Sequence, residues 1–191
     1  MIVATGLVEI RWHGRGGQGA VTSAELLARA AINEGKYAQA FPSFGPERRG
    51  APVVAFDRID AREPIRVRAD VAEPDIVIVL DPTLLRIVNV ASGLKDTGMM
   101  IVNTSRGIEE IDSQFPGKWG LATVDATRIA REELGVPIVN TTMLGALLRA
   151  TGVVNSDSLV GPLEDRFGRV AERNVKAMRR AMEETVVKER G

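Results

Sequence analysis

A glycine-rich stretch near the N-terminus constrains the fold more than any other part of the chain. It reads His13-Gly14-Arg15-Gly16-Gly17-Gln18-Gly19-Ala20, and it separates an apolar run, 7–12, from an alanine-rich segment with helical spacing, 20–34. Glycine permits positive φ angles and close backbone approach, and a helix N-terminus presents unpaired N–H groups. The pattern therefore predicts a strand, a tight turn and a helix, with the turn placed where α/β proteins bind phosphate groups.

The glycine spacing also satisfies the dinucleotide motif G-x-G-x-x-G at Gly14, Gly16 and Gly19. A dinucleotide site needs in addition an acidic residue about 20 residues later, at the end of the second strand, to bind the ribose hydroxyls. The second predicted strand, 36–41, ends without one, and the nearest acid, Glu34, precedes it. NAD binding is therefore disfavoured. Nucleotide hydrolysis is disfavoured as well, because no Gly-Lys-Ser/Thr follows the glycines.

The chemistry left for this turn is the binding of a phosphate or carboxylate group. Successive backbone N–H groups form a concave nest for an anion, with the guanidinium of Arg15 inside it and the amide of Gln18 beside it. The candidate anion-binding residues in the turn are Gly14, Arg15, Gly16, Gly17, Gln18 and Gly19. The alternative interpretation is a turn that only lets strand and helix pack closely.

A second candidate site is the loop 42–52, which carries the adjacent arginines Arg48 and Arg49. The loop contains three prolines and two glycines. A segment restricted by proline gives up little conformational entropy when it orders, so it can present its arginines pre-organised. We expect Arg48 and Arg49 to bind an anion or a partner; the alternative is that they are ordinary solvated surface charges.

The remainder of the chain alternates strands and helices. Two extended runs, 53–59 and 65–68, are expected to form a β-hairpin insertion after the second strand, and buried strands are expected at 75–80, 99–103 and 120–124. Helices are expected from Pro82 to about 90, from an N-cap at Asp125 or Thr127 to a stop at Gly135, and over 140–150, 156–167 and 169–190. The last of these carries one apolar stripe, formed by Ala171, Val175, Met178, Met182 and Val186, which is expected to pack on the core rather than mainly on another subunit.

This pattern predicts an α/β fold in a single domain, 1–191. The expected sheet is open, mostly parallel and Rossmann-like, with flanking helices, the hairpin insertion and a helical C-terminal third.

Composition excludes several classes of function. Lys plus Arg and Asp plus Glu each number 25, so no global charge favours nucleic acid or a membrane surface. The chain has no cysteine, and therefore no disulfide, no thiolate nucleophile and no means of holding an iron–sulfur cluster by thiolates. No apolar stretch approaches the roughly 20 residues of a membrane span, so a cytoplasmic protein is expected.

His13 is the only histidine, and it stands at the end of the first predicted strand. That place would suit acid–base catalysis. No carboxylate, serine or cysteine stands at a recognisable spacing from it, so a hydrogen-bonded structural histidine is favoured. No metal site and no catalytic residue are identified.

Two motifs in order carry a resemblance to a known family. The glycine stretch 14–19, followed by Ser43-Phe44-Gly45-Pro46-Glu47-Arg48-Arg49-Gly50, resembles the gamma subunits of the 2-oxoacid:ferredoxin oxidoreductases, and most closely those that act on pyruvate. The likeness continues through 52–56, 74–77, 140–145 and the helix around Asn174, so it covers nearly the whole chain. Phe44 stands where the family commonly has tyrosine.

The resemblance implies a function that this chain performs only within a complex. Enzymes of this family convert pyruvate, CoA and oxidised ferredoxin to acetyl-CoA, CO₂ and reduced ferredoxin, using thiamine diphosphate, Mg and iron–sulfur clusters held by alpha, beta and delta subunits. The chain is then the gamma subunit of a heterotetramer, inactive alone, with Arg15, Arg48, Arg49 and the glycine nest as candidate contacts to the CoA phosphates. The alternatives are a gamma subunit specific for 2-oxoisovalerate or 2-oxoglutarate and, less favoured, a free-standing Rossmann-like nucleotide-binding protein.

Overall fold

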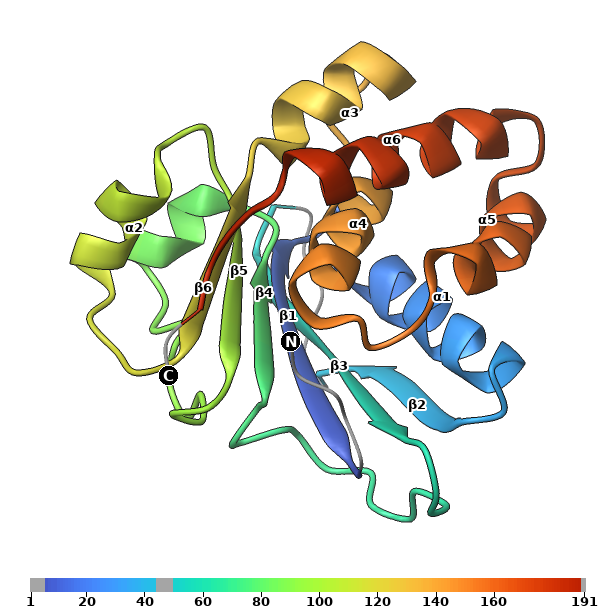
Figure 1. Cartoon of the computed structure of the whole chain (residues 1–191), viewed down its shortest axis with the longest axis horizontal. Helices are drawn as coiled ribbons and strands as arrows, with labels where there is room; N and C mark the ends of the chain where they lie inside the picture. Colours follow the sequence, from blue (N-terminus) through green and yellow to red (C-terminus); the bar gives the residue numbers. More distant parts are fainter. Residues whose placement is uncertain (1–5, 44–49, 190–191) are drawn as a thin grey trace.

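The computed structural model describes residues 6–43 and 50–189, and their strands form one sheet in the order β2-β3-β1-β4-β5-β6-β7 (Figure 1). The strands are β1 (Val8–Arg15), β2 (Tyr37–Pro42), β3 (Pro52–Asp60), β4 (Ile76–Val79), β5 (Met99–Asn103), β6 (Gly120–Val124) and β7 (Val186–Lys188). β1, β4, β5 and β6 are mutually parallel, β3 is antiparallel to both β1 and β2, and β7 is antiparallel to β6. Since only β3 and β7 run against the others, the predicted mostly parallel sheet is confirmed.

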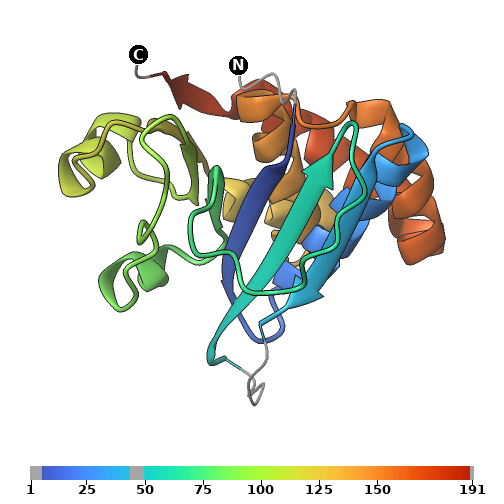
Figure 2. The same cartoon turned by 90° about the horizontal axis from the view of Figure 1, so that it is seen from below.

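Helices cover one face of the sheet, and shorter elements cover the other (Figures 1 and 2). The α-helices are α1 (Ala20–Asn33), α2 (Ile108–Gln114), α3 (Ala126–Leu134), α4 (Asn140–Thr151), α5 (Val160–Phe167) and α6 (Ala171–Glu184). Short 3₁₀ helices span η1 (Pro82–Arg86), η2 (Ser156–Leu159) and η3 (Gly168–Val170). Buried residues of α1, α3, α4, α5 and α6 share one core with the sheet, whereas η1 and α2 contribute to a second core on the opposite face. No helix in the described ranges has the length and apolar character that crossing a membrane requires.

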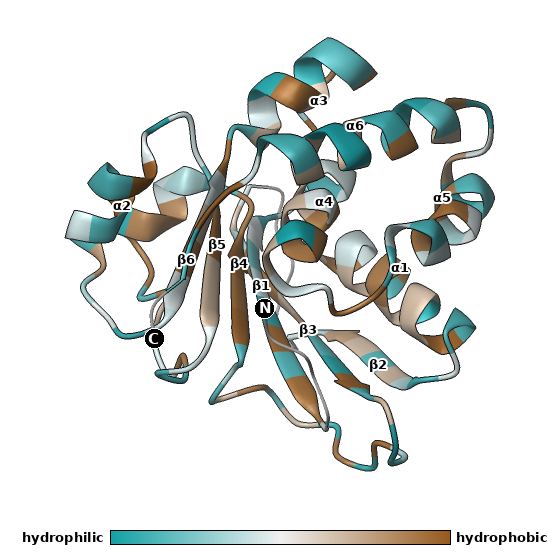
Figure 3. Cartoon of the chain, viewed as in Figure 1, coloured by the Kyte–Doolittle hydropathy of each residue, from teal (hydrophilic) through white to brown (hydrophobic). Residues whose placement is uncertain are grey.

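The central strands are buried on both faces, as a parallel strand between two layers must be. Along β4, Ile76 and Ile78 belong to the core under α1 and α4, while Val77 and Val79 belong to the core under η1 and α2. Figure 3 shows β4 as hydrophobic along its length. The uninterrupted apolar run read from the sequence is therefore explained by burial on two sides.

The hairpin predicted after the second strand, formed by 53–59 and 65–68, is absent. β2 and β3 form the antiparallel pair, and residues 65–68 form no strand. The prediction for 65–68 was wrong because β3 lies between β2 and β1 and has no free edge for a returning strand. The segment instead crosses the sheet face opposite the helices (Figure 2), where Gln39 Nε2 donates to Ile65 O at 2.8 Å and Arg58 Nη1 donates to Val67 O at 3.2 Å.

The predicted helix from Pro82 to about 90 is reduced to η1, which ends at Arg86. The following residues bend so that Val90 enters the second core, and the carbonyl oxygens of Val90 and Ser92 accept hydrogen bonds from the buried guanidinium of Arg11 at 3.0 and 2.5 Å. A continued helix would have used such carbonyls internally.

The C-terminal helix ends at Glu184 rather than 190, and the next residues form β7 on the outer edge of β6. Thr185, Val186 and Val187 are three consecutive β-branched residues, which favour strand over helix. The predicted apolar stripe was therefore wrong at Val186, which is 54% exposed on β7, whereas Ala171 and Met178 are buried as expected. The expected helix over 156–167 is divided into η2 and α5.

The crossing of α4 and α6 requires a glycine. A Cβ atom built on Gly145 would lie 2.0 Å from the carbonyl oxygen of Met178 and 3.0 Å from the Cβ of Ala181. No side-chain rotation relieves a contact with a backbone atom, so any larger residue must push the helices apart.

We therefore expect Gly145→Ala to destabilise the protein by about 1–3 kcal/mol through overpacking. Gly161→Ala in α5 is the matched control, because a Cβ at Gly161 meets nothing within 4 Å, and alanine there should raise stability by about 0.5–1 kcal/mol. Urea unfolding of both variants measures the difference. Equal stabilities would show that α4 and α6 separate without cost.

Candidate functional site

The candidate site lies at one edge of the sheet, where the parallel strands end. The glycine turn follows β1, Asp81 follows β4, Thr104 follows β5 and Asp125 follows β6. Ligands of open α/β sheets bind at this carboxyl edge, because loops of several strands and helix N-termini meet there. The segments that follow these four strands together form the surface where the predicted anion-binding residues lie.

Gly19 connects the turn to α1 and has a φ of +83°, the left-handed conformation that glycine adopts readily. A Cβ on Gly19 would lie 2.9 Å from Nδ2 and 3.0 Å from Cβ of Asn140, at the start of α4. Gly19 therefore packs closely against the start of α4, which is a different contact from the strand–helix packing that the alternative interpretation supposed.

Arg15 and Gln18 are both bonded to Asp81. Arg15 Nε donates to Asp81 Oδ2 at 3.1 Å, and Gln18 Nε2 donates to the same oxygen at 2.8 Å. Gln18 Oε1 in turn accepts from the backbone N–H of Arg15 at 2.8 Å, and Arg15 Nη2 donates to Thr83 Oγ1 at 2.8 Å. The two side chains predicted to face an anion therefore hold the turn against the end of β4.

Asp81 is the negative centre of this network. Partial burial alone would raise its pKa, but hydrogen bonds from the Thr83 hydroxyl and N–H and from Gln18, together with the charge of Arg15, hold the pKa of Asp81 below its ordinary value. The carboxylate is consequently ionised and compensates the charge of Arg15. An anion at the turn would have to share Arg15 with Asp81.

The glycine turn is also bonded to the loop that carries the second candidate site. Gly16 N donates to Ala51 O at 2.9 Å, Gly50 N donates to Gly16 O at 3.2 Å, and Arg15 Nη1 donates to Gly50 O at 2.9 Å. The structure thereby brings the C-terminal end of this loop to the turn. Arg48 and Arg49 themselves lie outside the described residues.

The N-terminus of α1 opens at the same edge. It has no acidic residue in its first turn, and no side chain of the described ranges caps it. Its first N–H groups have no partner within the helix and carry the positive end of the helix dipole.

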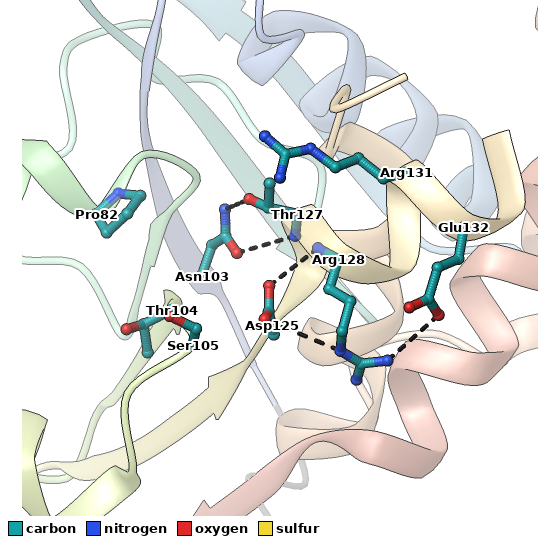
Figure 4. A pocket seen from close by; sticks show the side chains of 9 residues that line it. All are labelled: Pro82, Asn103, Thr104, Ser105, Asp125, Thr127, Arg128, Arg131 and Glu132. Carbon is teal, nitrogen blue, oxygen red and sulfur yellow. Dashed lines mark hydrogen bonds and ion pairs between the residues drawn. The ribbon is translucent and has the colours of Figure 1, made fainter. Parts of the chain in front are cut away.

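A cavity of about 380 Å³ opens beside the turn, between the ends of β4, β5 and β6 and the start of α3 (Figure 4). Asn103 forms its floor, donating to Leu80 O at 2.8 Å and to Thr127 Oγ1 at 2.9 Å. Its wall contains both acidic and basic side chains. The lining residues are Pro82, Asn103, Thr104, Ser105, Asp125, Thr127, Arg128, Arg131 and Glu132. Within the described chain the Arg131 guanidinium makes no ion pair, so it is the cation most available to a ligand.

Asp81 and Asn103 were missed by reasoning from the sequence. The sequence did contain a signal for them: Asp81 lies two residues after β4 and Asn103 ends β5, and polar residues at such positions meet at the carboxyl edge of the sheet. Of the two caps predicted for α3, Asp125 and Thr127, the structure has Asp125, whose Oδ1 accepts from Arg128 N at 2.9 Å.

His13 lies on the face of β1 opposite α1 and is 5% exposed. Arg11 Nε donates to His13 Nε2 at 3.0 Å, so this nitrogen is unprotonated. Burial, and secondarily the charge of Arg11, lowers the pKa of His13 to about 4. His13 is therefore a neutral histidine hydrogen-bonded within the fold, as the favoured interpretation predicted.

No group of three or more His, Cys, Asp or Glu side chains suited to a metal ion occurs in the part of the chain that the structure describes.

The depressed pKa of His13 predicts a specific pH dependence. Between pH 6.5 and about 4 the unfolded chain binds a proton at His13 that the folded chain does not, so stability falls with pH by about 1.4 kcal/mol per unit. His13→Gln retains an acceptor for Arg11 but lacks this titration. Urea unfolding from pH 7 to 4.5 should show the wild type losing about 2–3 kcal/mol more than the variant; parallel losses would contradict the assignment.

Comparison with known proteins agrees with the resemblance seen in the motifs. The pyruvate ferredoxin/flavodoxin oxidoreductase family model matches residues 9–184. The chain is 56% identical to a pyruvate/ketoisovalerate oxidoreductases common subunit gamma of Thermococcus litoralis, over 96% of this chain and 100% of that protein. It is 53% identical to pyruvate synthase subunit PorC of Methanothermobacter thermautotrophicus, over 93% of this chain and 96% of that protein.

A solved structure supports the same conclusion. The pyruvate oxidoreductase subunit PORC of Thermotoga maritima superposes with a TM-score of 0.86 at 41% identity, covering 96% of this chain and 99% of that one. The chain belongs to the pyruvate ferredoxin/flavodoxin oxidoreductase family.

Proposed function

We propose that this chain is the gamma subunit of a multisubunit pyruvate:ferredoxin oxidoreductase, which forms acetyl-CoA, CO₂ and reduced ferredoxin from pyruvate, CoA and oxidised ferredoxin. The observation that carries the proposal is full-length similarity to proteins named as gamma or PorC subunits of such enzymes. The similarity extends over 93–96% of this chain and 96–100% of those three relatives.

The redox chemistry of such a complex resides on other chains. This chain has no cysteine to hold an iron–sulfur cluster. We assign thiamine diphosphate, Mg and the clusters to alpha, beta and delta subunits, and electron acceptance to ferredoxin. The cytoplasmic location expected from the sequence stays a prediction.

The second candidate substrate is 2-oxoisovalerate. The Thermococcus litoralis relative is named as a subunit common to pyruvate and ketoisovalerate oxidoreductases. A gamma chain shared by two enzymes does not itself select the 2-oxoacid, which supports placing substrate choice on the other subunits.

The carboxyl edge of the sheet is the proposed contact with CoA. The hydrogen bonds from Gly16 and Arg15 to Gly50 and Ala51 support it, because they join the glycine turn to the loop of Arg48 and Arg49. The N-terminus of α1, which no side chain of the described residues caps, and the exposed Arg131 add positive potential at this edge. Since Asp81 compensates Arg15, we assign the main phosphate contacts to Arg48, Arg49 and backbone N–H groups.

Activity of the reconstituted complex tests the proposed function. The four co-expressed chains should reduce ferredoxin with pyruvate and CoA, and the purified chain alone should reduce none. Parallel assays with 2-oxoisovalerate and 2-oxoglutarate identify the preferred acid. Turnover of a substrate with NAD by the isolated chain would contradict a role as a gamma subunit.

Substitution of the two loop arginines tests the CoA contact. Charge-assisted hydrogen bonds to phosphate contribute about 1.5–3 kcal/mol each, so Arg48→Ala with Arg49→Ala should raise the apparent KM for CoA by roughly tenfold or more. CoA-independent pyruvate decarboxylation should persist. The matched control is Arg66→Ala with Arg68→Ala, two exposed arginines beyond the opposite end of β3. An unchanged KM in the loop variant would assign the pair to assembly or stability.

A further inference from the structure

A second pocket, far along the chain from the glycine turn, is lined mainly by apolar side chains. It encloses about 250 Å³ between the α3–α4 connection and the start of α6. Its lining residues are Leu134, Val136, Ile138, Asn140, Phe167, Val170, Arg173 and Asn174. We call it the apolar pocket.

The walls of the apolar pocket expose large hydrophobic side chains to solvent. Val136 is 43% exposed, Ile138 is 42% exposed and Val170 is 48% exposed. Val136, Pro137 and Ile138 are consecutive exposed residues. A single exposed hydrophobic residue is ordinary, but several around one concave site mark a binding surface.

The floor of the apolar pocket offers little polar recognition. Asn174 Nδ2 donates to Val170 O at 2.9 Å, and Asn174 Oδ1 accepts from Thr141 Oγ1 at 2.9 Å. Asn140 Oδ1 accepts from Thr141 N at 2.8 Å. The volume is also below the range of about 300–1,000 Å³ that small-molecule pockets occupy. An apolar side chain of a protein segment suits such a site better than a cofactor.

The rim supplies an uncompensated positive charge. Farther along α6, Lys176 pairs with Glu133 at 2.8 Å, and Arg180 pairs with Glu132 at 2.6 Å and with Glu133 at 2.8 Å. Arg173, one turn earlier, makes no ion pair with any residue the structure describes. Its charge therefore favours a carboxylate on whatever occupies the pocket.

We propose that the apolar pocket receives a segment of another subunit of the oxidoreductase, which inserts an apolar side chain between Ile138 and Val170 and places a carboxylate next to Arg173. The proposal rests on the multisubunit assembly described above. Apolar anchors in a concave site carry most of the energy of protein interfaces, and a flanking charge pair selects the partner.

Assembly of the full complex tests this docking. The four chains are co-expressed with an affinity tag on the alpha chain, and the gamma-to-alpha ratio is measured by quantitative mass spectrometry. Ile138→Asp and Val170→Asp should each lower that ratio at least tenfold, whereas Ile87→Asp, at a residue 60% exposed outside the pocket, should not. Arg173→Glu should lower it more than Arg149→Glu, whose arginine is also exposed.

A thiol-protection measurement keeps the test independent of folding defects. Because the chain lacks cysteine, Ile138→Cys introduces a unique thiol. Maleimide should label it in the isolated chain and at least tenfold more slowly in the purified complex.

Equal labelling, or normal assembly of both aspartate variants, overturns the proposal. Loss of self-association of the isolated chain with normal assembly would make a second copy the occupant and also overturn it. Failure of the wild-type chain to join the alpha chain would instead refute the proposed function.

Discussion

The ionised carboxylate of Asp81 is the constraint on which the candidate site depends. It lies at the end of β4 and accepts hydrogen bonds from Arg15 and Gln18 of the neighbouring strand's turn. A partly buried carboxylate that loses such partners incurs a large desolvation cost, so the turn is held in one conformation. That conformation places Gly16 against Gly50 and sets where α1 begins. Asp81 thus connects β4, the glycine turn and the loop before β3.

The sequence predicted the parts of the fold that local chemistry determines. The buried strands β5 and β6 and the ends of α3 were predicted correctly, because apolar runs and the residues Asp125 and Gly135 act on their own neighbours. The segment 65–68 and the end of α6 were predicted wrongly, because both depend on which sheet edge is free. The candidate site was predicted in part: the turn's position was right, but the pairing of Arg15 with Asp81 joins residues 66 apart in the chain.

The antiparallel strand β3 separates this fold from a dinucleotide-binding one. In a Rossmann sheet the second strand lies beside the first, and its end delivers the acid that binds ribose. Here β3 pairs with β1 and moves β2 to the outer edge. The end of β2, where a Rossmann fold has its ribose-binding acid, therefore does not lie beside β1 in this sheet. The glycine turn between β1 and α1 is kept, but the strand end that would recognise a nucleoside is absent from its side.

The central position of β1 affects how the chain becomes folded. β1 is made first during synthesis, yet its two neighbours are β3 and β4, and its register is completed only when residues near Val79 have emerged. Until then Ile10 and Trp12, both fully buried in the finished protein, have no sheet to enter. The last strand, β7, joins the edge of the sheet that lies farthest from β2. Because non-local strand pairing is slow, we expect these apolar side chains to stay exposed in the growing chain until β3 and β4 have emerged.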